Sequence, residues 1–150
     1  MNRARTLSLA ATAFGGILAG ATAGRLVVEL PALGRLGPKF WADYSRNADL
    51  SVRGAAFYPP LAIGHAALSV AAALALAKDR RAREPAVAAA ILTLSGLALT
   101  LKAAPNMLSV RHLGDDAAAL ERARRGFNFW SRIRGACHIG AFIANVWSLR

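Results

Sequence analysis

Apolar residues collect in four long stretches of the chain, which are separated by shorter polar and basic segments. The stretches cover about residues 7–30, 54–77, 85–104 and 130–149. Each is close to the roughly 20 residues that an α-helix needs to cross the hydrocarbon core of a bilayer. The pattern predicts an all-α protein, a four-transmembrane-helix antiparallel bundle that forms one integral membrane domain over residues 1–150.

The first and last stretches each carry small residues at every fourth position. These residues are Gly16, Gly20 and Gly24 in the first stretch, and Ala136, Gly140 and Ala144 in the last. On a helix they form a stripe that lets another backbone approach closely. We therefore expect these faces to pack against helices, either within the bundle or in a homo-oligomer.

The beginning of the chain also resembles a secretory signal. Arg3 and Arg5 precede the apolar run, and Ala21-Thr22-Ala23 is similar to a cleavage site. The apolar run continues through Val28, which is longer than a typical signal core. We predict a retained first span, with cleavage after residue 23 as the alternative.

Three polar segments connect the apolar stretches. Two are long, 31–53 and 105–129, and one is short, 78–84. Pro31 and Pro105 are expected to end the first and third helices, because proline lacks a backbone donor and disfavours a helical residue before it. In an antiparallel bundle both long loops lie at one end, and the short loop and both termini lie at the other.

Short amphipathic helices are predicted in both long loops. Trp41 and Tyr44 are three residues apart, as expected for aromatic rings at the headgroup level of an interfacial helix. In the second loop Asp115 and Asp116 are suited to open a short helix, where carboxylates favour the helix dipole. Glu121 and Arg125 are four residues apart there and are expected to pair.

Composition supports a membrane location. Hydrophobic residues make up 55% of the chain and charged residues 18%, whereas soluble domains have about 25% charged residues. The net charge of +11 comes from Lys and Arg that lie almost wholly between the apolar stretches. That distribution favours anionic lipid headgroups as the partner and argues against nucleic acid, which needs a basic folded face.

The basic residues also indicate an orientation. The short loop and the N-terminus are dense in Lys and Arg, which predicts that they face the cytoplasm. The expected location is the bacterial inner membrane, with cytoplasmic termini. The single cysteine, Cys137, rules out an internal disulfide and leaves the redox compartment open.

Polar side chains of all four stretches are expected to converge at the end with the long loops. The candidates for catalysis are Glu29, His65, Asn106, Arg134 and His138, and the candidates for substrate binding are Arg25, Tyr58, Lys102 and Trp130. No serine or cysteine nucleophile signature and no phosphate-binding glycine loop occurs in the chain.

Four of these candidates are ionisable groups within or near the membrane. Arg25 lies one turn before Glu29 and is its expected ion-pair partner, with a site carboxylate or proton carrier as the alternative role of Glu29. His65 and His138 lie roughly 16 and 12 Å into their helices. A histidine at that depth is a functional candidate or a neutral group bonded to a neighbouring helix. A haem held by both histidines is an alternative, while no spacing indicates a metal site.

Three segments carry a family resemblance. They are the glycine-rich first span from Gly20-Ala21 to Glu29-Leu30-Pro31-Ala32-Leu33, the segment Pro105-Asn106-Met107-Leu108, and Phe127-Asn128-Phe129-Trp130 leading to Arg132 and Arg134. Together they resemble the anthrone oxygenase-like family of small four-helix membrane proteins. The chain departs from the family on the last helix. Arg134 stands where a His or Asn is expected, and Cys137, next to His138, stands where an Arg is expected.

The resemblance implies a cofactor-free oxygenase that converts an anthrone, a hydrophobic aromatic polyketide, into an anthraquinone. In such chemistry a histidine or carboxylate would remove a proton, and an Arg or Asn would stabilise the oxyanion. The main alternative is a non-catalytic accessory protein that binds lipid or a partner. A haem- or quinone-binding protein and a small transporter are further alternatives.

Overall fold

The computed structural model describes residues 3–150, and within this range it contains helices and turns but no strand. The elements are α1 (Arg3–Gly24), the π-helical turn η1 (Arg25–Glu29), α2 (Leu30–Leu36), α3 (Pro38–Tyr44), the π-helical turn η2 (Ser45–Asp49), α4 (Val52–Ala75), α5 (Arg83–Leu108), the 3₁₀ turn η3 (Ser109–Arg111) and α6 (Ala117–Trp147). The all-α prediction is confirmed.

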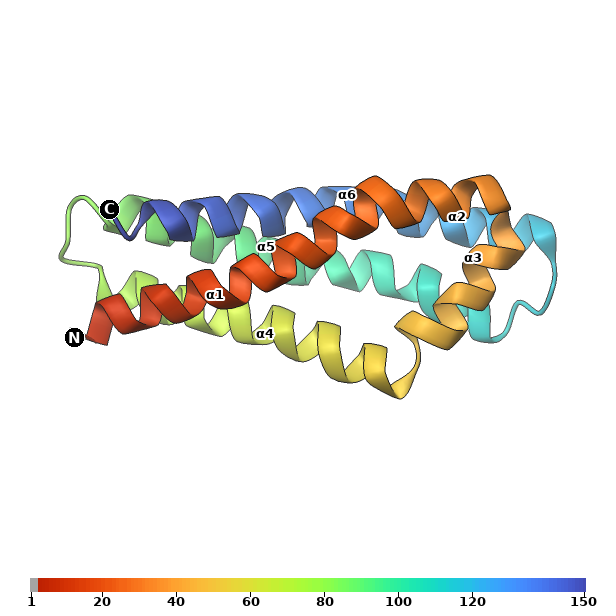
Figure 1. Ribbon diagram of the computed structural model, residues 1–150, viewed down its shortest axis with the longest axis horizontal. Helices are drawn as coiled ribbons and strands as arrows, with labels where there is room; N and C mark the ends of the chain where they lie inside the picture. The colour runs from red at the N-terminus through yellow and green to blue at the C-terminus, as the bar shows by residue number, and fades with distance from the viewer. Residues whose placement is uncertain (1–2) are drawn as a thin grey trace.

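Four long helices lie lengthwise beside one another (Figure 1). α1 packs against α4 and α6, and α5 packs against α4 and α6. Successive long helices run in opposite directions, so that α2, α3 and η3 gather at one end of the molecule. Both chain termini lie near the other end, beside the turn that joins α4 to α5.

Three helical stretches are long and apolar enough to cross a membrane. They are Arg3–Leu36, Val52–Ala75 and Arg83–Arg111. Large apolar side chains on the outer faces of the helices are exposed, as expected for surfaces that meet lipid. Examples of these exposed side chains are Ile17, Ile63, Leu74, Ile91, Leu101 and Ile143. The chain therefore has the character of a membrane protein, although α6 is too polar to meet the same criterion.

The two prolines expected to end helices do not do so. At Pro31 the chain continues into α2, and the wider turn η1 directly precedes it. A proline supplies no N–H and its ring crowds the carbonyl four residues earlier, so a π-turn at that point relieves the clash. Pro105 lies inside the last turns of α5, which continues to Leu108.

The second long loop is shorter than predicted, because α6 begins at Ala117 and not near residue 130. The Asp116 carboxylate caps the helix by accepting hydrogen bonds from the backbone N–H groups of Ala118 and Ala119, each at 3.0 Å. The prediction that Asp115 and Asp116 open a helix is therefore confirmed for Asp116, whereas Asp115 pairs with Lys39. The short helix expected in this loop is not a separate element, because it continues without interruption into the fourth apolar stretch as α6.

The predicted pair between Glu121 and Arg125 is present. Arg125 donates to Glu121 Oε1 at 2.7 Å, and Arg124 donates to both carboxylate oxygens at 2.7 and 2.8 Å. The hydrogen bonds from Arg124 and then Arg125 lower the pKa of Glu121 to about 2. This carboxylate thus fixes the first turns of α6 at the end with the long loops.

A compact apolar core closes the end with the long loops. Trp41 is fully buried there, with its ring centroid 5.9 Å from that of Phe127. Leu30, Leu33 and Leu120 belong to the same cluster. The Trp41 ring is enclosed by protein and does not lie on the surface of an amphipathic helix, because α3 packs against α6 and α2 joins the same cluster.

Candidate functional site

A cavity of about 440 Å³ lies between the long helices, towards the end with the long loops. Its walls come from α1, α4, α5 and α6, and η2 also contributes to them. The lining is mostly apolar, but four of the predicted site residues take part in it. These four are Arg25, Tyr58, Arg134 and His138. A pocket of this size and character is typical of sites for small organic ligands.

One stripe of α6 supplies a polar wall of the cavity. Phe127, Ser131, Arg134 and His138 follow one another at helical spacing and all line it. Residues three and four apart lie on the same helix face, so a single rotation of α6 about its axis places all four side chains at the cavity. Arg134 Nη1 is 3.5 Å from Thr100 Oγ1 of α5. In this way α6 brings two basic side chains to the cavity one helical turn apart.

Arg25 and Asp49 form a buried ion pair at the cavity wall. The two guanidinium Nη atoms donate to the two carboxylate oxygens at 2.5 and 2.6 Å. Their side chains are only 10% and 6% exposed. Both residues lie in π-helical turns, Arg25 at the start of η1 and Asp49 at the end of η2. The expected pairing of Arg25 with Glu29 is therefore wrong.

Glu29 has a different partner. Its carboxylate accepts a hydrogen bond from the Tyr44 hydroxyl at 3.0 Å. Burial, together with this hydrogen bond and the charge of Glu29, raises the pKa of Tyr44 to about 12. Glu29 does not line the cavity, and its contact joins η1 to α3. Its position favours a structural role over the predicted catalytic one.

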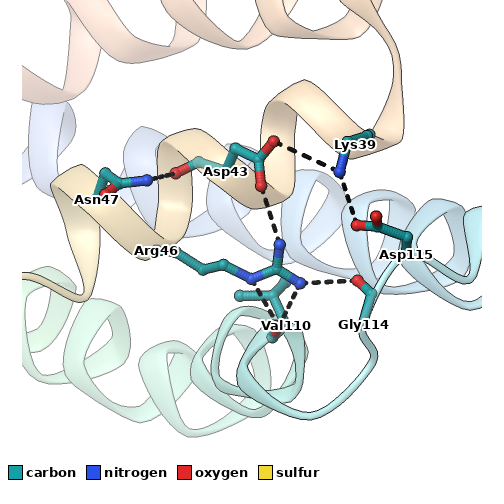
Figure 2. Close-up of polar contacts among 7 residues, drawn as sticks. All are labelled: Lys39, Asp43, Arg46, Asn47, Val110, Gly114 and Asp115. Atoms are coloured by element: carbon teal, nitrogen blue, oxygen red, sulfur yellow. Dashed lines mark hydrogen bonds and ion pairs between the residues drawn. The ribbon is translucent and has the colours of Figure 1, made fainter.

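Polar contacts between the two long loops hold η2 in place, as Figure 2 shows. The Arg46 guanidinium donates to the backbone carbonyl of Val110 at 2.8 and 3.0 Å and to that of Gly114 at 2.8 Å. Lys39 pairs with Asp115 at 2.7 Å. These contacts, here called the loop clasp, fix the segment that carries Asp49 against the ends of α5 and α6.

Several buried polar atoms at the cavity have no partner within the described residues. They are Ser131 Oγ, His138 Nδ1 and Arg25 Nε. No carboxylate among residues 3–150 lies within ion-pair distance of Arg134. Buried polar groups are nearly always hydrogen bonded. These unsatisfied atoms belong to side chains that line the cavity, although each atom is itself covered by protein.

His65 lies outside this cavity, in a separate buried network. Its Nε2 is 3.0 Å from Asn145 Nδ2, and the same amide nitrogen donates to Ser69 Oγ at 3.0 Å. All three side chains are fully buried between α4 and α6. A Cβ atom at Gly15 of α1 would lie 2.6 Å from His65 Nε2, so only glycine leaves room for the ring.

The three remaining predicted site residues do not reach the cavity lining. Asn106 donates to the backbone carbonyl of Lys102 at 2.9 Å, on its own helix. Lys102 is exposed, and Trp130 packs against the apolar core under the long loops. The structure thus separates Asn106, Lys102 and Trp130 from the residues that surround the cavity.

Five polar residues of the cavity lining are absent from the predicted site: Thr22, Asp49, Thr100, Arg111 and Ser131. Asp49 belongs to a mixed-charge loop, and its partner is 24 positions away, so no local spacing indicates it. Ser131 is different, because it lies at helical spacing between Phe127 and Arg134 and the register of α6 would have indicated it.

The described part of the chain, residues 3–150, contains no group of three or more His, Cys, Asp or Glu side chains that could hold a metal ion. A haem bound by both deep histidines stays a prediction, but only His138 lines the cavity, and His65 Nε2 already contacts Asn145. Comparison with known proteins adds no relative: no family model, curated protein or solved structure matches the chain.

Proposed function

We propose that the chain crosses the membrane four times. α6 packs beside α1 and α5, so if those two helices span the bilayer, α6 spans it as well. Three polar side chains in the apolar part of α6 are buried, whereas Arg132, near the start of that part, is exposed. Ser131, His138 and Asn145 are all buried inside the protein, which is where polar side chains of membrane helices belong.

The positions of the termini and of the short basic turn indicate how the protein is oriented in the membrane. Both termini lie at the end with the short basic turn, so we propose that this end faces the cytoplasm and the end with the long loops faces the opposite side. A reporter that is active only outside the cytoplasm, fused after Arg150, should be silent. An active reporter would reverse the assignment.

We propose that the protein is a cofactor-independent oxygenase for a hydrophobic aromatic carbon acid, in line with its resemblance to anthrone oxygenases. The observation that carries this proposal is an apolar cavity that holds two basic groups one helical turn apart. His138 has a ring nitrogen without a partner, and Arg134 has no carboxylate partner among residues 3–150. A general base and a cationic oxyanion partner are the two groups that such a reaction needs.

In the proposed reaction His138 accepts a proton from the acidic CH₂ carbon of an anthrone. The electron pair moves into the ring system and gives an enolate, whose oxygen is stabilised by Arg134. O₂ is the oxidant and takes four electrons from the substrate. One oxygen atom forms the new carbonyl group, and the other leaves as water with the two protons of the CH₂ carbon. One anthrone and one O₂ therefore give one anthraquinone and one water.

Oxygen uptake by the purified protein with an anthrone tests the proposal. We expect one quinone for each O₂ consumed, without hydrogen peroxide. His138→Gln should lower kcat about 10²- to 10⁴-fold, which is the usual contribution of a general base. Arg134→Gln should lower it about 10²- to 10³-fold.

Matched controls are available for both variants. His112→Gln removes a histidine on the exposed loop, and Arg132→Gln removes an exposed arginine two positions before Arg134 on α6. Both should keep the wild-type rate. Wild-type turnover by His138→Gln, or no quinone formation by the intact protein with any anthrone, would overturn the oxygenase assignment.

A second candidate is an accessory protein that binds lipid without catalysis. It is favoured by a shallow hollow of about 430 Å³ near the C-terminus, lined by Phe142, Ile143, Val146, Trp147 and Arg150. An apolar surface next to a basic side chain suits an acyl chain and its anionic headgroup. This alternative predicts co-purifying anionic lipid that is lost in Arg150→Gln, together with no oxygen uptake.

A further inference from the structure

The walls of the cavity are unequal in their exposure. On α1 and α6 no lining side chain is exposed: Leu18 and Phe127 are only 4% and 1% exposed, and the remaining ones are buried or half-buried. On α4 and α5 the lining includes Ile63, Leu101 and Leu108, which are 58%, 76% and 45% exposed. The cavity therefore opens sideways, between α4 and α5.

This lateral opening lies within the apolar part of the molecule. Ile63 is 11 residues after the start of α4, and Leu101 is seven before the end of α5. At 1.5 Å per residue these positions are about 16 and 10 Å from the helix ends. Both helices are long and apolar enough to cross a membrane, so the opening faces hydrocarbon and not water.

Access from the end with the long loops is restricted by protein. The loop clasp ties η2 to the second loop through Arg46 and Lys39. Just below it the Arg25–Asp49 ion pair and the buried Trp41 fill the space between α1, α3 and α6. Arg111 of η3, which also lines the cavity at this end, is exposed, so these contacts narrow the route from water and do not close it.

The charges around the cavity do not balance. Three arginines, Arg25, Arg111 and Arg134, line it together with a single carboxylate, Asp49. Asp49 is fully engaged by Arg25 through two hydrogen bonds. Arg134 has only the long contact to Thr100. Arg134 is partly buried, and a cation without a counter-ion is costly in a low-dielectric environment, so an anionic ligand group would remove that cost.

We propose that the cavity receives its ligand from the bilayer, through the opening between α4 and α5, and binds it as an amphiphilic anion whose single oxyanion pairs with Arg134. The apolar body lies against Ile63 and the neighbouring apolar lining. Carboxylates of fatty acids and phenolates or enolates of aromatic compounds share this chemistry. The inference rests on the cavity assigned under the proposed function, but it does not depend on turnover.

Binding can be measured by tryptophan quenching in nanodiscs of a neutral lipid. The buried Trp41 ring packs on Phe127, which lines the cavity, so a brominated ligand in the cavity should quench its fluorescence. Trp130 packs against the same apolar core and is kept, whereas Trp147 lies at the far end and is replaced by Phe in all variants. The probes are a brominated long-chain carboxylic acid and its methyl ester, and a brominated naphthol and its methyl ether.

The head-group arm compares Arg134→Gln with the matched control Arg132→Gln. In the parent and in the control, the acid should bind about tenfold or more tightly than its ester, as expected for a charge-assisted hydrogen bond. In Arg134→Gln the two probes should bind within about twofold of each other. Arg134→Lys keeps the cation and should keep the preference. An unchanged preference in Arg134→Gln, or a parent that prefers neither the acid over its ester nor the naphthol over its ether, would overturn the assigned anion site.

The access arm uses stopped-flow mixing of nanodiscs with vesicles that carry the brominated acid. Ile63→Phe/Leu101→Phe adds bulk at the opening and should slow quenching about tenfold or more, with a smaller change in the final amplitude. Ile91→Phe/Leu94→Phe adds the same bulk on exposed positions of α5 outside the cavity lining and should have no effect. Equal rates in the two double variants would refute lateral access.

The two pairs of probes distinguish the sources of the anion. A preference for the naphthol over its ether, without one for the fatty acid, identifies the ligand as an aromatic oxyanion, and the reverse identifies it as a lipid carboxylate. If the anion preference holds while no anthrone is oxidised, the oxygenase proposal fails and this inference stands. If an anthrone is oxidised but Arg134→Gln binds acid and ester as the parent does, the inference fails alone.

Discussion

The ion pair between Arg25 and Asp49 allows a sharp test of how the cavity end is held together. Asp49→Asn keeps the size of the side chain and removes the negative charge. The two short hydrogen bonds and side-chain exposures of 10% and 6% describe a desolvated pair. Removal of one partner from a buried pair costs about 3–5 kcal/mol, because the other charge is left uncompensated. Here the cost should lie at the upper end, because Arg134 also lines this cavity without a carboxylate of its own.

The exposed pair in the same loop is the matched control. Asp43 pairs with Arg46 at 2.9 Å, but its side chain is 47% exposed. Asp43→Asn should therefore cost about 0–1 kcal/mol. Reversible unfolding in mixed micelles with increasing dodecyl sulfate, followed by far-UV circular dichroism, gives both free energies of unfolding.

A double variant separates the loss of the pair from the loss of charge. Arg25→Met/Asp49→Leu removes both charges and should differ from the parent by less than about 2 kcal/mol, since apolar replacement of a buried pair is often close to neutral. The reasoning is refuted if Asp49→Asn costs no more than Asp43→Asn, or if the double variant is less stable than Asp49→Asn.

Two further predictions concern other contacts. Gly15→Ala should lower the free energy of unfolding by about 1–3 kcal/mol in the same assay, because the added Cβ would overlap the buried His65 ring. The control Gly20→Ala should be tolerated, because a Cβ there meets no atom within 4 Å. Equal stability of the two variants would contradict the close fit of the His65 ring against α1. A spectrophotometric titration should show one tyrosine that ionises near pH 12, assigned to Tyr44 by its loss in Tyr44→Phe. Because the pKa of this phenol is raised on folding, its hydrogen bond to Glu29 contributes stability below about pH 10 that is lost as the pH rises towards 12; an ordinary value near 10 would exclude the buried bond.

Helix content and membrane character follow from local pattern alone. The apolar runs near 54–77 and 85–104 correspond to α4 and α5 because their length and composition need no tertiary information. The prolines are misleading for a local reason. Pro31 by itself predicts the end of a helix, but the π-turn η1 before it lets the helical chain continue. The free-energy cost of a π-turn depends on the tertiary contacts of the widened segment.

The candidate site can be predicted only where helical register carries the information. Arg134 and His138 are one turn apart on α6, so both side chains lie on the same face of the helix. The remaining predicted residues do not all converge on the cavity, because similar depth on different helices does not specify rotation. His65 has a depth comparable to that of His138 and yet faces Asn145 and Ser69.

The sequence by itself determined that this is a helical chain with membrane-length apolar segments, two long loops at one end, and the candidates Arg134 and His138 four residues apart on the last helix. Only the tertiary structure decided that Arg25 pairs with Asp49, that Trp41 is enclosed, and that a cavity opens between α4 and α5. The physical reason is that helix formation and membrane partition depend on neighbours within a few residues. Ion pairing between distant residues and the enclosure of a side chain depend instead on how each helix is rotated about its axis and on where a loop packs. Many contacts between residues far apart in the sequence determine these together.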